Sequence, residues 1–149
     1  MMQEGIFIFD LDGTLANAEH RVHLIQNHPK QWDEFYNQSK FDAPIVETIY
    51  TLQALYRAGN NIWIWTGRSS QVRDITEEWL MKNSISYDQL LMRQETDHRP
   101  DFKVKQECLS KIPKEDFKRL IGVFEDRNQV VNMWRQFGIQ CFQVNEGNF

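Results

Sequence analysis

The chain has 149 residues, a length that suits one domain able to bury a hydrophobic core without disulfides. Its formal net charge of −4 excludes a general attraction for the nucleic-acid backbone, so that such a partner requires a local cationic patch. Neither Cys108 nor Cys141 has zinc-ligand spacing, and the sequence lacks a membrane-length apolar run or a leader-like N-terminus. We therefore predict a soluble, cytoplasmic protein with no membrane partner.

The first predicted element is a strand over residues 5–9, which is aromatic and β-branched without a polar interruption. Such strands are buried on both faces and are usually parallel and central. Asp10 and Asp12 follow it directly, at the end of the strand where open α/β sheets bind ligands. Two adjacent carboxylates resist joint ionisation, so the pair indicates a hard metal ion, an acid/base division of labour, or both.

A β-hairpin is the alternative for this segment, because Asp12-Gly13 is a strong turn sequence. Residues 15–17 do not continue as an alternating strand, which argues against the hairpin.

The segment 16–41 that follows is polar and aromatic, with one short helix expected at 31–37, and loops of this length are usually functional. We expect a minimal cap over about 16–43. His20 and His23 have no further ligands nearby and are interpreted as polar loop residues. Trp32, Phe35 and Tyr36 either stack on a nucleobase or pack the cap onto the core.

The rest of the chain alternates between amphipathic helices and apolar strands. Helices are predicted at 44–58, 71–82, 104–112 and 128–137, and strands at 61–65, 86–92, 120–124 and 139–144. Pro44 opens the first helix, Tyr56 lies on its apolar stripe, and Trp79 and Trp134 are core positions. The pattern predicts one α/β domain over 1–149, a Rossmann-like three-layer sandwich with a mostly parallel sheet.

Polar clusters follow three of the predicted strands and therefore share one edge of a parallel sheet. The clusters are Asp10 with Asp12, Thr66 with Arg68, and Glu125 with Asp126. Acids from two strand ends suit Mg²⁺, and the hydroxyl and main-chain N–H groups near Thr66 suit phosphate oxygens. With cations from residues 93–105, this chemistry suits phosphoryl transfer to a carboxylate.

The chain resembles the haloacid dehalogenase-type phosphatases over nearly its whole length. The matching motifs, in order, are Asp10-Leu11-Asp12-Gly13-Thr14, Thr66-Gly67-Arg68, Lys105 and Glu125-Asp126. Arg21 and the segments 97–105, 125–135 and 141–149 are most similar to the 3′-phosphatase domain of phage polynucleotide kinase-phosphatases. That likeness points to a phage origin and to action in the host cytoplasm. No GxxxxGK[ST] phosphate loop occurs, so no kinase domain is expected in this chain.

The resemblance implies a role for each acid. Asp10 is the nucleophile that forms an aspartyl-phosphate, and Asp12 is the general acid and then the general base. Burial beside another carboxylate is expected to raise the pKa of Asp12 toward the working pH. Mg²⁺ is expected at the Asp10 carboxylate, the main-chain carbonyl of Asp12, and Asp126. Glu125 supports the metal, and because phage enzymes have two aspartates there, the direct ligand of the two is left open.

The resemblance also implies the phosphate ligands: Thr66, Gly67, Lys105, Arg68, Arg21 and Arg99. The predicted function is Mg²⁺-dependent removal of the 3′-phosphate from DNA or RNA ends. Two alternatives stay open, a phosphatase of mononucleotides or other small phosphomonoesters, and a phosphate-binding module without turnover. The sequence does not predict the oligomeric state.

Overall fold

The computed structural model describes residues 4–149 and contains a five-stranded parallel sheet in the order β5-β4-β1-β6-β7. The central strand β1 (Ile6–Phe9) pairs with β4 (Asn61–Ser69) and β6 (Leu120–Glu125). The edges are β5 (Gln89–Arg93) and β7 (Cys141–Gln143). The sheet confirms the predicted α/β class and the central position of the first strand.

All four residues of β1 are buried, and they alternate between two cores. Phe7 and Phe9 face one core, whereas Ile6 and Ile8 face the other. This period of two explains why an unbroken apolar strand occupies the middle of the sheet, where neither face meets water.

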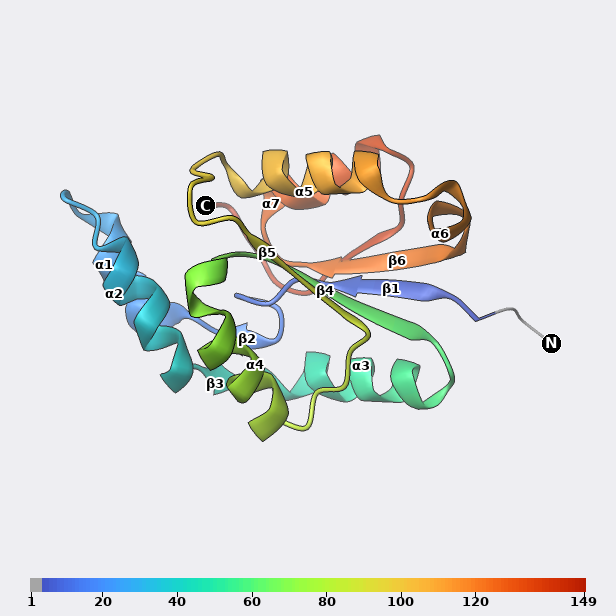
Figure 1. The fold of residues 1–149 in the computed structure, drawn as a ribbon, viewed down its shortest axis with the longest axis horizontal. Coiled ribbons are helices and arrows are strands. Elements are labelled where there is room, and N and C mark those ends of the chain that lie inside the picture. Colours follow the sequence, from blue (N-terminus) through green and yellow to red (C-terminus); the bar gives the residue numbers. More distant parts are fainter. Residues whose placement is uncertain (1–3) are drawn as a thin grey trace.

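Helices cover both faces of the sheet and complete three layers (Figure 1). On one face lie α3 (Val46–Arg57) and α4 (Arg73–Lys82), which contributes Trp79 to the core. On the other lie α5 (Asp101–Lys111) and α7 (Asn128–Gln136), which contributes the fully buried Trp134. Both tryptophans are core residues, as predicted.

Several predicted bounds were wrong for local reasons. Pro44 does not open α3, because it pairs with Ala16 in a short strand instead, and Tyr56 is exposed. Strand β4 continues past residue 65 to Ser69, and α5 begins three residues earlier than expected, directly after Pro100. The helix α6 (Lys114–Arg119) was not predicted, because it buries no residue and has no apolar stripe.

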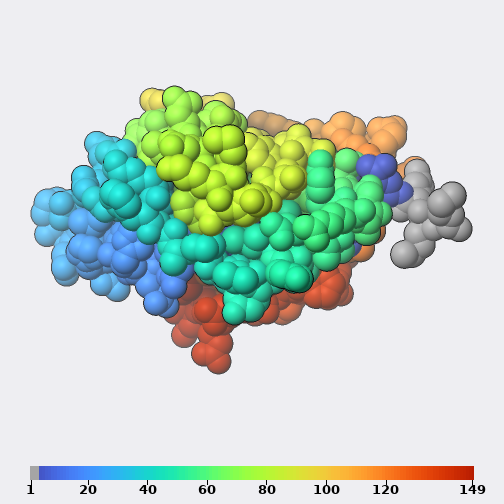
Figure 2. All heavy atoms as spheres, turned by 90° about the horizontal axis from the view of Figure 1, so that it is seen from below, coloured from blue at the N-terminus to red at the C-terminus, as the bar shows by residue number. Residues whose placement is uncertain are grey.

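The cap contains the helix expected at 31–37, and it also contains a second helix and two short strands that were not predicted. It leaves and rejoins the sheet domain through two antiparallel strands, β2 (Ala16–Asn17) and β3 (Ala43–Pro44). Between them lie α1 (His23–Gln26) and α2 (Trp32–Asn37), with short 3-10 turns. The cap projects beyond the carboxyl end of β1 and forms one end of the molecule (Figures 1 and 2).

Within residues 4–149, no helix has the length and apolar character needed to cross a membrane.

Candidate active site

The chain turns sharply after β1 and so holds Asp10 at the carboxyl edge of the sheet. The main-chain N–H of Asp10 donates to the carbonyl of Phe124 at 2.9 Å, and the Thr14 hydroxyl donates to Asp10 Oδ2 at 3.2 Å. Gly13 has φ +80°, and a Cβ there would lie 2.0 Å from Asp126 Oδ2. Glycine is therefore required both by the turn and by the close approach of Asp126. The hairpin alternative is wrong, since both partners of β1 are parallel strands.

Three buried carboxylates, those of Asp10, Glu125 and Asp126, offer oxygen atoms that all lie within 4.8 Å of one another. Lys105 Nζ lies 2.8 Å from Asp10 Oδ1 and 2.9 Å from Glu125 Oε2. Asp101 adds a fourth carboxylate, 3.2 Å from the same ammonium. Among residues 4–149, Lys105 is the one cation within ion-pair distance of this cluster, so the acids outnumber the positive charge.

Burial and this excess of negative charge together shift the pKa values of the cluster. Burial and the neighbouring Asp10 raise the pKa of Asp126 to about 7, and the same two causes raise that of Glu125 well above its usual range. Burial alone would lower the pKa of Lys105, but the carboxylates around it raise it well above the usual value. The oxygen ligands and unbalanced charge fit Mg²⁺. The cluster unites three of the four residues predicted for the metal, and the side chain of Asp12 is not part of it.

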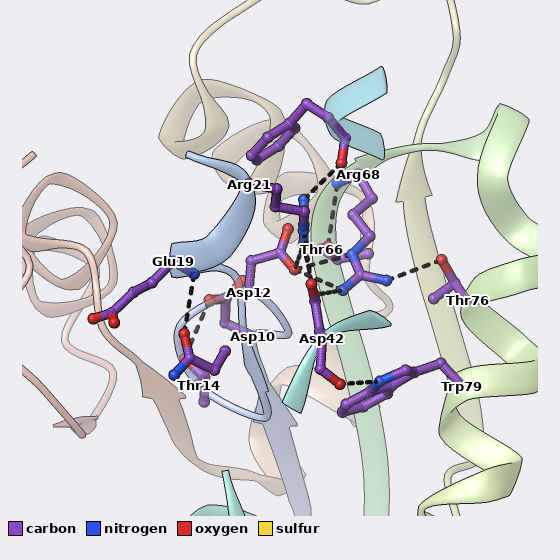
Figure 3. Close-up of polar contacts among 12 residues, drawn as sticks. Asp10, Asp12, Thr14, Glu19, Arg21, Asp42, Thr66, Arg68, Thr76 and Trp79 are labelled. Carbon is purple, nitrogen blue, oxygen red and sulfur yellow. Dashed lines mark hydrogen bonds and ion pairs between the residues drawn. The ribbon is translucent and has the colours of Figure 1, made fainter. Parts of the chain in front are cut away.

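Asp12 lies instead between two arginines (Figure 3). Its Oδ1 accepts hydrogen bonds from Arg21 Nη2 at 2.7 Å and from Arg68 Nη2 at 2.7 Å. Burial raises the pKa of Asp12, but the charges and hydrogen bonds of Arg68 and Arg21 outweigh it and hold the pKa below the usual value. This finding reverses the expected direction of the pKa shift, because no local sequence pattern places both guanidinium groups on this carboxylate.

Asp42 is a site residue that the sequence analysis missed. Its carboxylate is fully buried and accepts hydrogen bonds from Arg21 Nε at 2.8 Å and Arg68 Nη2 at 3.0 Å. His20 Nε2 lies 2.7 Å from Asp42 Oδ1, and the indole of Trp79 donates to the Asp42 carbonyl at 2.9 Å. Asp42 thus orients both arginines, and its position at the end of the cap carried no motif that would have revealed it.

The end of β4 contains Thr66 and Gly67, the residues predicted to bind phosphate, and is called the phosphate loop below. The Thr66 hydroxyl is buried and accepts a hydrogen bond from the Arg68 main-chain N–H at 3.1 Å. A Cβ at Gly67 would lie 2.7 Å from Asp101 Oδ1, a buried oxygen without a hydrogen-bond partner among residues 4–149. Arg93 Nε donates to the Gly67 carbonyl at 2.9 Å. Asp101 and Arg93 therefore border the loop, although neither was singled out from the sequence.

Arg99 is not brought to these residues. Its exposed guanidinium pairs with Asp97 at 2.7 Å and with Glu107, on the outer side of the loop that precedes α5. The structure therefore unites nine of the ten predicted site residues at the carboxyl edge of the sheet and leaves Arg99 outside. The nine are Asp10, Asp12, Arg21, Thr66, Gly67, Arg68, Lys105, Glu125 and Asp126.

Known structures share this fold. A chain of the Pnkp1/Rnl/Hen1 complex is 32% identical, with a TM-score of 0.80, over 100% of this chain and 49% of that one. A chain of the Pnkp1/Rnl/Hen1 RNA repair complex is also 32% identical, with a TM-score of 0.81, over 98% of this chain and 44% of that one. This chain thus spans about half the length of those relatives. The class C acid phosphatase from Bacillus anthracis with tungstate bound, at 17% identity, a TM-score of 0.67 and coverage of 99% and 69%, shows the fold alone.

The fold, the paired acids and the buried lysine define a haloacid dehalogenase-type phosphatase, a phosphoric monoester hydrolase. Residues 4–149 match the family described as the polynucleotide kinase PNKP phosphatase domain. The chain belongs to this family, which confirms the resemblance drawn from its motifs.

Proposed function

We propose that this chain is a Mg²⁺-dependent phosphatase that removes the 3′-phosphate from nucleic-acid ends through an aspartyl-phosphate on Asp10. The observation that carries the proposal is that Asp10 and Asp12 lie in different surroundings. Asp10 lies in the acidic cluster, 2.8 Å from Lys105 Nζ, whereas Asp12, two residues later, is held by two arginines. These different surroundings, one ammonium beside Asp10 and two guanidinium groups on Asp12, support separate roles as nucleophile and proton carrier.

The acidic cluster provides the site for the metal. Asp10, Asp126 and the main-chain carbonyl of Asp12 would hold Mg²⁺, with Glu125 in support. When bound, the ion offsets the negative charge that gathers on the phosphoryl oxygens during transfer. Lys105 Nζ, the Thr66 hydroxyl and the main-chain N–H of Gly67 hold those oxygens from the protein side.

In the first step, a carboxylate oxygen of Asp10 bonds to phosphorus as the bond from phosphorus to the sugar oxygen breaks. Asp12 gives its proton to that departing oxygen. In the second step, Asp12 takes a proton from water, whose oxygen attacks phosphorus and releases inorganic phosphate and free Asp10. Lys105 stays protonated throughout, because the surrounding carboxylates raise its pKa.

The acid role of Asp12 requires that the arginines release it. A phosphate dianion is a strong acceptor for guanidinium groups, and it would draw Arg21 and Arg68 away from the Asp12 carboxylate. The pKa of Asp12 then rises toward the working pH, since burial remains while the opposing charges are taken up by the substrate. In this scheme, substrate binding is coupled to the protonation of Asp12.

The choice of a nucleic-acid end rests on the family and on the relatives. The family is described by the phosphatase domain of polynucleotide kinase, and two of the similar chains belong to a complex described as an RNA repair complex. The substrate comes to this chain by that likeness, and a direct comparison of substrates tests it.

The test measures phosphate release from a 3′-phosphorylated oligonucleotide, a 5′-phosphorylated one of the same sequence, and 3′-mononucleotides. DNA and RNA versions of each are assayed with and without Mg²⁺. We expect the 3′-phosphorylated oligonucleotides to give the highest kcat/KM, and Asp10→Asn to abolish turnover while the fold is retained. Turnover of mononucleotides alone would overturn the polynucleotide assignment. Turnover by Asp10→Asn would contradict an aspartyl-phosphate intermediate on Asp10.

A further inference from the structure

The three aromatic side chains of α2 are buried to different degrees. Phe35 is buried, and the guanidinium carbon of Arg21 lies 4.4 Å from the centre of its ring. The Phe35 carbonyl also accepts a hydrogen bond from Arg21 Nη1 at 3.2 Å. Phe35 therefore packs α2 against Arg21 of the candidate site, and this contact explains why one of the three aromatic residues is present.

Trp32 and Tyr36 are less buried than Phe35, and of the two Tyr36 is half-buried. Trp32 is 44% exposed, although an indole gains more than most side chains from burial. The rings of Trp32 and Tyr36, one helical turn apart, have centroids 5.9 Å apart and an interplanar angle of 28°. Phe35 meets Trp32 edge-on, at 5.7 Å and 90°. The buried ring thus supports a pair of roughly parallel rings at the protein surface.

The helix α2 lies close to the site, and Tyr36 is the member of the pair nearer to it. Gln71 Nε2, just after the phosphate loop of β4, donates to Asp33 Oδ1 on α2 at 3.1 Å, which ties the helix to that loop. Burial raises the pKa of Tyr36, and the charges of Arg93 and Asp12 also act on its phenol, as expected for a group close to the catalytic carboxylate.

Cations lie near both rings of the pair, and the carboxylates of Asp12 and Asp101 also act on Tyr36. Lys30 Nζ lies 5.6 Å from the centre of the Trp32 ring. All the hydrogen bonds of the Arg93 guanidinium within residues 4–149 go to main-chain carbonyl oxygens, so no carboxylate of the described chain neutralises it. Exposed aromatic rings beside unneutralised cations are the elements with which proteins hold single-stranded nucleic acid.

We propose that Trp32 and Tyr36 form a stacking platform for the nucleobases next to the terminal phosphate. The inference rests on the proposed function and adds to it, because it explains how a site that reads only phosphate would distinguish a nucleic-acid end from other phosphomonoesters. Stacking accepts any base, so the platform selects for bases as a class and not for a sequence.

The test removes the ring and the base separately. One substrate is a 3′-phosphorylated oligonucleotide, and the other is the same oligonucleotide with its two terminal bases absent. For Trp32→Ala, we expect kcat/KM on the first substrate to fall by about 5- to 150-fold relative to kcat/KM on the second. Trp32→Phe keeps a ring and should retain most of the ratio. Phe117→Ala is the matched control, since Phe117 is also 44% exposed and also lies on a six-residue helix, α6.

The outcomes separate the two proposals. If Trp32→Ala lowers kcat/KM equally on both substrates, the ring serves only the structure of the cap. The platform is then wrong, while the phosphatase assignment stands. An unchanged ratio for both Trp32→Ala and Tyr36→Ala overturns the platform in the same way. If the unmodified protein does not act on 3′-phosphorylated oligonucleotides at all, the proposed function fails, and the platform fails with it. Thermal unfolding of each variant shows whether the cap still folds.

Discussion

Arg68 donates two hydrogen bonds to a single oxygen of Asp12, from Nε at 3.0 Å and from Nη2 at 2.7 Å. Arg21 adds a third to the same oxygen, so the second aspartate of the motif is held as an anion in the substrate-free site. The proposed mechanism makes Asp12 the general acid, which needs a proton, so in that mechanism the arginines must leave Asp12 before it can act.

Replacement of Asp12 tests this role. For Asp12→Ala, we expect kcat on a 3′-phosphorylated oligonucleotide to fall by about 10²- to 10⁴-fold, because the sugar oxygen leaves without a proton. The loss on p-nitrophenyl phosphate should be smaller, since nitrophenolate leaves readily without one. Asp12→Asn keeps an acceptor for both arginines and should show the same difference between substrates, with thermal stability closer to that of the unmodified protein. Equal losses on the two substrates would contradict the acid role.

Asp42 carries a second prediction, on stability. Its fully buried carboxylate lies 2.7 Å from Arg21 Nη2 and 3.0 Å from Arg68 Nη2. Asp42→Asn should lower the free energy of unfolding by about 3–5 kcal/mol, as is typical when one partner of a buried ion pair is removed. Urea unfolding at neutral pH measures the loss. Glu95→Gln, at an exposed position without a side-chain hydrogen bond or ion pair within residues 4–149, should change stability by less than about 0.5 kcal/mol. A loss for Asp42→Asn as small as this control would show that Asp42 does not support the arginines.

The acidic cluster predicts how stability and metal binding depend on pH. Burial and Asp10 raise the pKa of Asp126 in the folded protein to about 7. A carboxyl whose pKa is raised on folding contributes its full stability only below its unfolded pKa, near 3.8, and loses that contribution as the pH rises through about 7. The free energy of unfolding of the metal-free protein should therefore fall between about pH 5 and pH 8, by more than about 1 kcal/mol.

Mg²⁺ should reverse this loss mainly at about pH 8, where the Asp126 carboxylate is ionised and able to bind the ion. Urea unfolding at both pH values, with and without Mg²⁺, measures the effect. Asp126→Asn should reduce the dependence on pH, to which Glu125 still contributes through its own raised pKa, and should remove most of the dependence on Mg²⁺. Stabilisation by Mg²⁺ that is as large at the lower pH as at the higher one would argue against a role for Asp126 in metal binding.

The edge of the sheet that carries the candidate site was predictable because it follows from the parallel direction of the strands. Parallel strands end at one edge, so Asp10, Thr66 and Asp126, each directly after an apolar run, had to lie together. Lys105 has no such position, since it lies on α5, and it was identified through the resemblance of its motif.

The cap was much less predictable, because its residues acquire their partners only through tertiary folding. Asp42 meets Arg21 and Arg68 across 21 and 26 residues of sequence, and no local pattern records those distances. The predicted direction of the pKa shift of Asp12 was wrong for the same reason, since Arg21 and Arg68 reach Asp12 from other segments of the chain. Arg99 has a motif-like position, but its local partners Asp97 and Glu107 hold it at the surface.

The C-terminal segment gives the last prediction, because it packs directly against the main chain of Asp126. Gly147 accepts a hydrogen bond from the Asn128 N–H at 2.9 Å, and Gln143 Nε2 donates to the Asp126 carbonyl at 2.9 Å. A Cβ at Gly147 would lie 2.0 Å from that carbonyl oxygen and 2.6 Å from the Arg127 Cα, and these main-chain atoms cannot move aside without moving Asp126.

Gly147→Ala should therefore displace the segment, lower stability by about 1–3 kcal/mol and weaken Mg²⁺ binding, because the Asp126 carboxylate loses its fixed position. Thermal unfolding of the metal-free protein and calorimetric titration with Mg²⁺ separate the two effects. Asn148→Ala, at the exposed neighbouring position, is the control and should change neither quantity. If Gly147→Ala lowers stability but leaves the Mg²⁺ affinity unchanged, the C-terminal segment supports the fold without positioning Asp126.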